Sequence, residues 1–304
     1  MLPPFTVLSL LLNGGVRAAA INLLAAGVVA AVAYGANYLT HTPNQWIALG
    51  IGAYSAISWV HGLKLSDPAT FAMMFRSRTF NLISIGFPCI AFVTYGMGFW
   101  SAPFMLRVHG VGLAEAGTIL GLGGALGGWI GVTLGGVLSD RLRSRTANAR
   151  LYVGLTVPVL AGPFAVWFVT TDNAWIAYAC SFFFSIFSPM WIGAAASTVN
   201  DLVMPRMRAL ASAYYILMVT FIGLALGPYL IGQISDNYIG QGLAEGDALR
   251  IAMLWGCCML GVSVIFLLAA LKFLETEEGS RLERASALGE MESTPGRVAG
   301  SSQS

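Results

Sequence analysis

The residues most able to do chemistry in this chain form a charged cluster at the end of a glycine-rich, apolar run. Residues 135–145 read GGVLSDRLRSR, which places one carboxylate, Asp140, beside Arg141, Arg143 and Arg145. A carboxylate near the C-terminal end of a helix faces the negative pole of the helix dipole. We therefore expect Asp140 to be stabilised by another partner, such as a helix N-terminus or an arginine of a neighbouring helix.

The other reactive side chains do not suggest an enzyme or a metal site. The 14 acidic residues and the 3 histidines lie in loops, at the ends of apolar runs or in the C-terminal tail, and the 4 cysteines lack the spacing of metal ligands. The chain has neither a G-x-S-x-G sequence nor a phosphate-binding loop. We therefore predict no catalytic activity, no cofactor and no metal, and no carboxylate at mid-membrane that would relay protons.

The composition is that of an integral membrane protein. The 304 residues are 57% hydrophobic and 10% charged, with a mean hydropathy of +0.73, whereas soluble domains carry about 25% charged residues. The net charge of +2 is too small to favour nucleic acid as a partner.

The apolar runs predict an all-α membrane protein with eight transmembrane helices, because a helix needs roughly 20 apolar residues to cross a bilayer. The runs lie near residues 17–39, 44–60, 80–104, 113–138, 151–171, 174–199, 209–233 and 251–272. Of the 16 lysines and arginines, this topology leaves only Arg107 and Arg250 on the side opposite to residue 17. This asymmetry predicts that both termini are cytoplasmic. The expected location is the bacterial inner membrane.

Two segments carry a resemblance to a known family. Gly136, Asp140, Arg141 and Arg145 fit the pattern G-x-x-x-D-R followed by a further arginine, which resembles the cytoplasmic loop motif of the major facilitator superfamily. The chain departs from the motif at Arg143, where the family often has glycine. Just upstream, glycines at 127, 131 and 135 recur every four residues and give one helix face without side-chain bulk.

The second segment lies in the seventh apolar run. Gly223, Gly227, Pro228 and Gly232 form G-x-x-x-G-P-x-x-x-G, a pattern that permits bending and close packing of a helix. This segment resembles the eleventh helix of the superfamily, and together with residues 95–117 it is similar to the spinster-like branch.

The resemblance implies a division of the chain. The eight spans would correspond to helices five to twelve of a twelve-helix transporter, so that the first four helices are missing. Residues 1–60 would be the remainder of the N-terminal half with two spans, 61–79 a cytoplasmic linker, 80–273 the C-terminal six-helix half and 274–304 a disordered cytoplasmic tail.

The implied function is secondary active transport by alternating access. The expected solute is a small organic or amphipathic, lipid-like molecule, with a proton or a cation as a coupling partner and the lipid bilayer as surroundings. The substrate pathway is expected to use Thr94, Tyr95, Trp191, Tyr215 and Thr220, with Ser185 and Ser188 nearby. Two alternatives stay open, namely an organic-anion transporter of the same superfamily and a truncated remnant that transports nothing.

Overall fold

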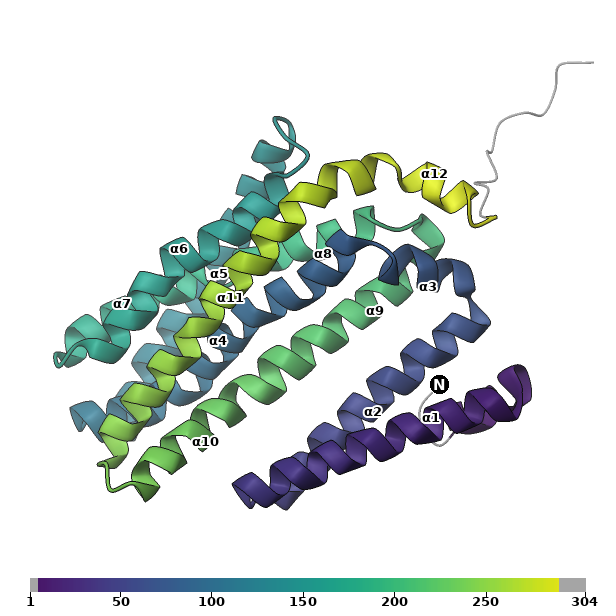
Figure 1. The fold of residues 1–304 in the computed structure, drawn as a ribbon. Coiled ribbons are helices and arrows are strands. Elements are labelled where there is room, and N and C mark those ends of the chain that lie inside the picture. The colour runs from purple at the N-terminus through teal and green to yellow at the C-terminus, as the bar shows by residue number, and fades with distance from the viewer. Residues whose placement is uncertain (1–4, 290–304) are drawn as a thin grey trace, which may run out of the picture.

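The computed structural model describes residues 5–289, and all regular structure in this range is helical (Figure 1). The α-helices are α1 (Phe5–Thr40), α2 (Pro43–Ser66), α3 (Pro68–Phe75), α4 (Arg78–His109), α5 (Leu113–Arg143), α6 (Ala149–Thr170), α7 (Ala174–Phe187), α8 (Trp191–Asp201), α9 (Arg208–Met218), α10 (Leu226–Gly240), α11 (Glu245–Gly279) and α12 (Arg281–Ser286). A short 3-10 turn, Pro205–Met207, precedes α9, and a π-helical segment, Val219–Ala225, joins α9 to α10.

Within the described residues, eight helical stretches are long and apolar enough to cross a membrane, which confirms the prediction of eight spans. They are Gly14–Thr40, Pro43–Ser66, Arg78–His109, Leu113–Arg143, Ala149–Thr170, Ala174–Asp201, Pro205–Gly240 and Glu245–Gly279. The chain is therefore an integral membrane protein. Two of these spans are interrupted: the sixth has a turn at residues 188–190 between α7 and α8, and the seventh contains the π-helical segment.

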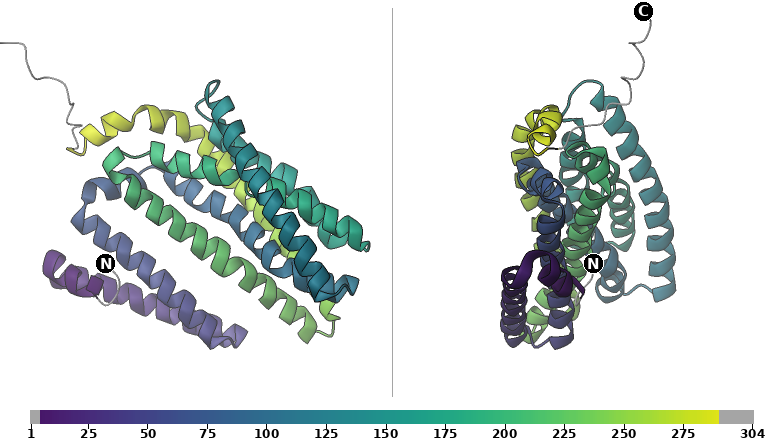
Figure 2. Two further views of the ribbon diagram at one scale, coloured as in Figure 1. Left: turned by 180° about the vertical axis from the view of Figure 1, so that it is seen from behind. Right: turned by 90° about the vertical axis from the view of Figure 1, so that its right-hand side faces the viewer.

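The helices form a six-span bundle with a two-helix hairpin beside it. In Figures 1 and 2, α4 and α11 lie at the centre, α5, α6 and α7 cover one side, and α9 and α10 cover the other side, next to α2. The most apolar window of α4 is 67% buried, against 17% for α1, α2, α5 and the seventh span. Among the described residues, the buried hydrophobic core lies from Met73 onward, and Leu63 of α2 is its one member from the hairpin. The packed core is therefore that of the six-span bundle, and α1 and α2 present most of their surface outward.

A polar cluster holds the α1–α2 hairpin together. Asn22 is fully buried; its amide donates to Ser58 Oγ at 3.1 Å and accepts from the Tyr54 hydroxyl at 2.7 Å. Hydrogen bonds of this kind stabilise helix pairs where lipid offers no hydrophobic driving force for association. Helical geometry in α1 is interrupted near its beginning by Gly15, whose φ is 69°.

The hairpin meets the bundle along α9 and α10. Trp59 of α2 stacks on Tyr214 of α9 with ring centroids 6.1 Å apart. At the other end of α2, the Thr42 and Tyr229 hydroxyls lie 2.7 Å apart, and the Trp46 ring meets the Tyr229 ring edge-on at 5.8 Å.

The segments expected to be a linker and a disordered tail contain helices. The connection between α2 and α4 includes α3, whose first turn is capped by Asp67 through a 2.9 Å bond from the Thr70 N–H. At the other end, α11 continues to Gly279 and α12 covers Arg281–Ser286, so residues 274–279 and 281–286 are helical where composition suggested disorder. The part of that prediction that concerns 290–304 lies outside the described residues. The end of α11 and the beginning of α12 are ordered because their charged residues, Glu277, Glu278 and Arg281, bind neighbouring helices.

Candidate functional site

A cavity at the middle of three spans brings several polar side chains together. It has a volume of about 250 Å³ and extends between α4, α5 and α7 from the middle of the spans toward the α4–α5 connection. Thr94 and Gly128 mark its inner end, since each stands near the middle of its own span, Arg78–His109 or Leu113–Arg143. For helices that cross a bilayer, this is the depth of the membrane midplane.

The polar groups of this cavity are hydroxyls. Five residues of its lining carry one, namely Thr94, Ser101, Ser181, Ser185 and Ser188, and none of its described lining residues is charged. The Thr94 hydroxyl donates to the Ile90 carbonyl at 3.0 Å, and the Ser185 hydroxyl donates to the Ser181 carbonyl at 2.8 Å. These two hydroxyls donate to their own helices, so each still has oxygen lone pairs that can accept a hydrogen bond from a solute.

The structure brings only part of the predicted substrate pathway into this cavity. Thr94 lines it, together with Ser185 and Ser188. Tyr95 is one position further along α4 and is 40% exposed on another face, near Gly223. Thr220 is exposed in the π-helical segment.

Trp191 and Tyr215 lie in the core instead. Both are 5% exposed, and the Trp191 ring stacks on Phe87 with centroids 5.9 Å apart. Within the described part of the chain, the Trp191 Nε1 and the Tyr215 hydroxyl have no hydrogen-bond partner. A buried donor without a partner is costly, so both groups are candidates for a partner that the described residues do not supply in this conformation.

Two rows of small residues on α5 shape the cavity. One row, Gly124 and Gly128, faces the cavity, and a Cβ added at either position meets open space. The other row packs on the α7–α8 segment: a Cβ at Gly131 would overlap the Ile186 carbonyl oxygen, and a Cβ at Gly135 would overlap that of Met190. The smooth face expected from the four-residue spacing is therefore a helix contact, and it fixes the distance between two walls of the site.

The glycines of the seventh span also lie against a neighbouring helix. A Cβ at Gly223 would come within 2.6 Å of Ala91 Cβ, and one at Gly227 within 2.6 Å of the Phe92 carbonyl oxygen, so α4 is the partner at both positions. Pro228 has no N–H, and the irregular segment Val219–Ala225 ends three residues before it. Its carbonyl accepts a bond from Trp100 Nε1 at 2.8 Å, and Gly232 makes room for the same indole ring.

The predicted gate motif lies at the end of α5. Asp140, Arg141 and Arg145 are exposed, and a Cβ at Gly136 would meet no neighbour. Within residues 5–289, the side chains of these three charged residues form no ion pair, so the partner expected for Asp140 is not present in this conformation.

Other charged residues tie the helix ends together at this side of the bundle. Arg143, the departure from the family motif, forms an ion pair with Glu278 of α11, and Arg150 of α6 forms one with Asp201 of α8. Arg281 donates to the Asp201 carbonyl at 3.2 Å. Composition assigned Glu278 and Arg281 to a tail, and the only sequence signal for their role was their position directly after an apolar run.

Glu277, which precedes Glu278 on α11, caps the N-terminus of α4. Its carboxylate accepts bonds from the Ser77 hydroxyl at 2.5 Å, the Arg78 N–H at 2.8 Å and the Thr79 N–H at 3.0 Å. The first turn of α4 contains no acidic residue of its own. Glu277 therefore supplies the negative charge that a helix N-terminus favours.

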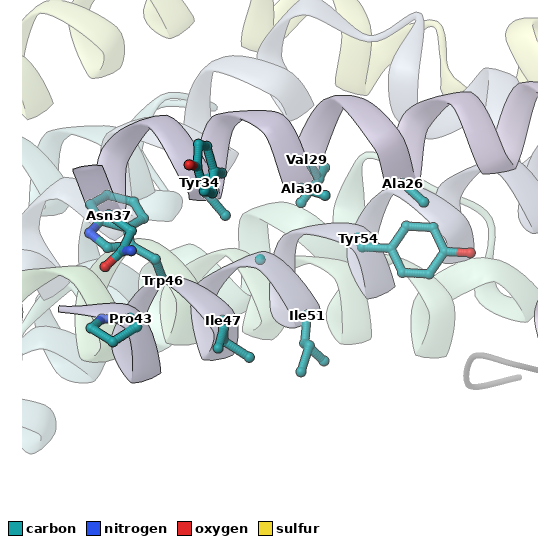
Figure 3. Close-up of a pocket in the computed structure, with 12 residues that line it drawn as sticks. Ala26, Val29, Ala30, Tyr34, Asn37, Pro43, Trp46, Ile47, Ile51 and Tyr54 are labelled. Atoms are coloured by element: carbon teal, nitrogen blue, oxygen red, sulfur yellow. The ribbon is translucent and has the colours of Figure 1, made fainter. Parts of the chain in front are cut away.

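A second hollow lies in the α1–α2 hairpin. It has a volume of about 400 Å³ and is lined mainly by small and apolar side chains, with Tyr34, Asn37, Trp46 and Tyr54 at its edges (Figure 3). Its polar groups are few, and the Trp46 Nε1 and the Tyr54 hydroxyl already bind Thr40 and Asn22, which leaves Asn37 and Tyr34 to orient a solute. The hydroxyl-lined cavity between α4, α5 and α7 is therefore the stronger candidate site.

Comparison with known proteins agrees with the fold. The family model described as Major Facilitator Superfamily matches residues 3–228. An MFS-type efflux pump of Mycolicibacterium smegmatis is 24% identical over 201 residues, which cover 66% of this chain and 46% of that protein. Protein spinster homolog 1 of Homo sapiens is 31% identical over 206 residues, which cover 61% of this chain and 38% of that protein. The chain thus spans less than half the length of these two relatives.

A solved structure has a similar fold. The crystal structure of a bacterial homolog to the human lysosomal transporter spinster, in an inward-facing and occupied conformation, superposes with a TM-score of 0.58 at 23% identity. The superposition covers 76% of this chain and 58% of that chain. The resemblance to spinster proteins read from the sequence is confirmed by these relatives. Because the family model covers most of its length, this chain belongs to the major facilitator superfamily, a family of membrane transporters.

Proposed function

We propose that this protein is a secondary transporter of an amphipathic, lipid-like solute in a bacterial inner membrane, with both termini in the cytoplasm. The observation that carries the proposal is the cavity between α4, α5 and α7, which reaches the middle of the spans and whose described lining offers hydroxyls and no charge. Such a lining suits a solute with an uncharged or internally compensated polar group. The similarity to spinster proteins supports a lysolipid or a sphingoid-like molecule.

The lining also favours the proposal over the organic-anion alternative. An organic anion is best held by arginine or lysine, and the described lining of the cavity contains neither. The activity that we propose is transport and not catalysis. A proton or a cation remains our expectation for the coupling partner.

Alternating access would use the division expected from the sequence. We propose that residues 1–60 and 80–273 move relative to one another about the 61–79 connection, with the contacts of α2 to α9 and α10 changing between states. Gly136, Asp140, Arg141 and Arg145 would form the cytoplasmic gate. In this account Asp140 acquires its partner in a conformation other than the one described here.

Uptake by proteoliposomes tests the proposal. The purified chain is reconstituted, and the uptake of a radiolabelled lysophospholipid is compared with that of empty liposomes. Gly128→Leu places a side chain into the cavity without an overlap at its Cβ, whereas Gly121→Leu, on the same helix, lies outside the cavity and serves as the matched control. We expect Gly128→Leu to lower the initial rate at least about tenfold and Gly121→Leu to keep it; equal rates in the two variants would refute the role of the cavity.

A further inference from the structure

A third cavity lies at the end of the bundle that carries the α10–α11 connection. It has a volume of about 550 Å³, is open to the surface, and is lined by the beginning of α2, the second half of α4, the π-helical segment and α10. Its lining combines the Asp236 carboxylate, three aromatic rings and two amides, contributed by Phe99, Trp100, Tyr229, Gln45 and Gln233. The mid-membrane cavity described above shares none of these residues.

The negative charge of Asp236 is not compensated within the described part of the chain, where its side chain has no ion pair and no hydrogen bond. The two arginines at this end of the bundle are engaged elsewhere. Arg107 pairs with Glu245 at 3.3 Å, and Arg250 pairs with Asp172 at 2.9 Å. Asp236 also stands in the last turns of α10, where the carbonyl end of the helix adds to the negative potential.

The aromatic walls of the cavity are held in place. The Trp100 indole is fixed to α10 by its 2.8 Å bond to the Pro228 carbonyl, and a Cβ at Gly232 would lie only 2.9 Å from the ring. The Tyr229 ring is fixed from the other side by Thr42, whose hydroxyl is 2.7 Å from its own. Rings that are ordered before a ligand binds lose little entropy when it does.

The amides of Gln45 and Gln233 complete the lining. Neither has a hydrogen-bond partner among the described residues, and both are half-buried. Their carbonyl oxygens can accept bonds from an N–H group, while a carboxylate and an aromatic face both attract a positive charge.

We propose that this cavity is a binding site for a small organic ammonium ion that carries an apolar substituent. The ammonium group is bound by Asp236 and by the two amides, and its substituent packs on Trp100 and Phe99. Aromatic walls favour an organic cation over a hydrated inorganic one, because they replace water by an apolar and weakly negative surface. The site is distinct from the cavity of the proposed transport function, so it does not depend on that function.

Equilibrium binding to the purified full-length chain in detergent tests the site. The probes are benzylammonium chloride and benzyl alcohol, which are similar in size and differ in charge. Asp236→Asn removes the charge at an exposed position, and its matched control is Asp247→Asn, an exposed acid at the same end of the bundle outside the cavity. Trp100→Leu, with Trp175→Leu as control, tests the aromatic wall.

We expect benzylammonium to bind the wild type about tenfold or more tightly than benzyl alcohol. Asp236→Asn abolishes this preference, Asp247→Asn retains it, and Trp100→Leu weakens the binding of both probes. Absence of benzylammonium binding to the wild type, equal affinity for the two probes, or an unchanged preference in Asp236→Asn would each overturn the proposal. Since the assay measures no transport, a failure of lysophospholipid uptake refutes the proposed function without touching this site.

Discussion

Replacing Glu277 by glutamine tests how the end of α11 stabilises the bundle. The two carboxylate oxygens accept three hydrogen bonds at the N-terminus of α4, with Arg78 N–H on one oxygen and Ser77 Oγ and Thr79 N–H on the other. Glutamine keeps a single acceptor oxygen and turns an NH₂ group toward at least one of these donors. The substitution also removes the negative charge that Glu277 of α11 places beside the N-terminus of α4, whose first turn contains Arg78 and no acidic residue.

The size of the effect follows from these contacts. A hydrogen bond to a charged group contributes about 1.5–3 kcal/mol, and a charge at a helix end contributes about 0.3–1 kcal/mol. Because the site is only half-buried and glutamine preserves part of the bonding, we expect a loss of about 2 kcal/mol in the free energy of unfolding. For a chain of 304 residues this corresponds to a melting temperature lowered by roughly 3 °C, because the entropy of unfolding is about 2.1 cal/mol/K per residue.

The assay is thermal unfolding of the purified protein in detergent, followed by circular dichroism, combined with hydrogen exchange of the segment that contains Arg78 and Thr79. The matched control is Glu275→Gln, two residues earlier on α11, where the carboxylate is exposed and has no partner among the described residues. If Glu277→Gln and Glu275→Gln melt at the same temperature and exchange the α4 amides equally fast, the capping role of Glu277 is wrong.

Three further outcomes are expected. Asn22→Leu leaves the Ser58 and Tyr54 hydroxyls without their partner and lowers the free energy of unfolding by ~1 kcal/mol, measured by thermal unfolding. Gly135→Ala, whose Cβ would overlap the Met190 carbonyl oxygen, lowers the melting temperature by several degrees, whereas the neighbouring Gly136→Ala, which meets no atom, leaves it unchanged; equal melting of the two variants would contradict the packing argument. Partial burial raises the pKa of Asp67, but bonds from the Arg206 and Thr70 side chains and from the Thr70 N–H outweigh it and hold the pKa below its usual value. The stability from Asp67 is therefore present above about pH 4 and lost as the pH falls through the lowered pKa, and pH-dependent unfolding of Asp67→Asn lacks this component.

The spans could be predicted from sequence because lipid leaves the chain little choice. A run of about 20 apolar residues must satisfy its own backbone groups, and in such a run only a helix does so. The glycines of α5 could be predicted as a contact face for a similar reason, since their four-residue spacing puts three positions without side chains on one line.

The direction of individual side chains inside a span could not be predicted. Thr94 and Tyr95 are neighbours in sequence, yet one lines the cavity and the other is 40% exposed on another face, because one helical step turns the chain by about 100°. Where every face of a helix is apolar, no pattern of polar residues reveals which face meets the core. For this reason Trp191 and Tyr215, expected on the pathway, are found buried at 5% exposure.

The charged contacts at the helix ends were also beyond the sequence. Glu277 and Glu278 belong by composition to a polar tail, and their partners lie about 200 and 135 positions away in the chain. Only the folded bundle brings the end of α11 next to the beginning of α4 and the end of α5. The irregular segment Val219–Ala225 shows the same limit, since Pro228 indicated that the helix can bend and did not indicate a π-helical segment before it.

Photocrosslinking tests the central claim most directly, namely that the solute binds at mid-membrane between α4, α5 and α7. A lysophospholipid with a photoreactive group is bound to the reconstituted chain, illuminated, and its adducts are mapped by mass spectrometry with and without excess unlabelled lysophospholipid. We predict competed adducts in the segments that contain Thr94, Gly128 and Ser185. Competed adducts confined to the hollow of the α1–α2 hairpin, or labelling that excess lysophospholipid does not reduce, would contradict the account.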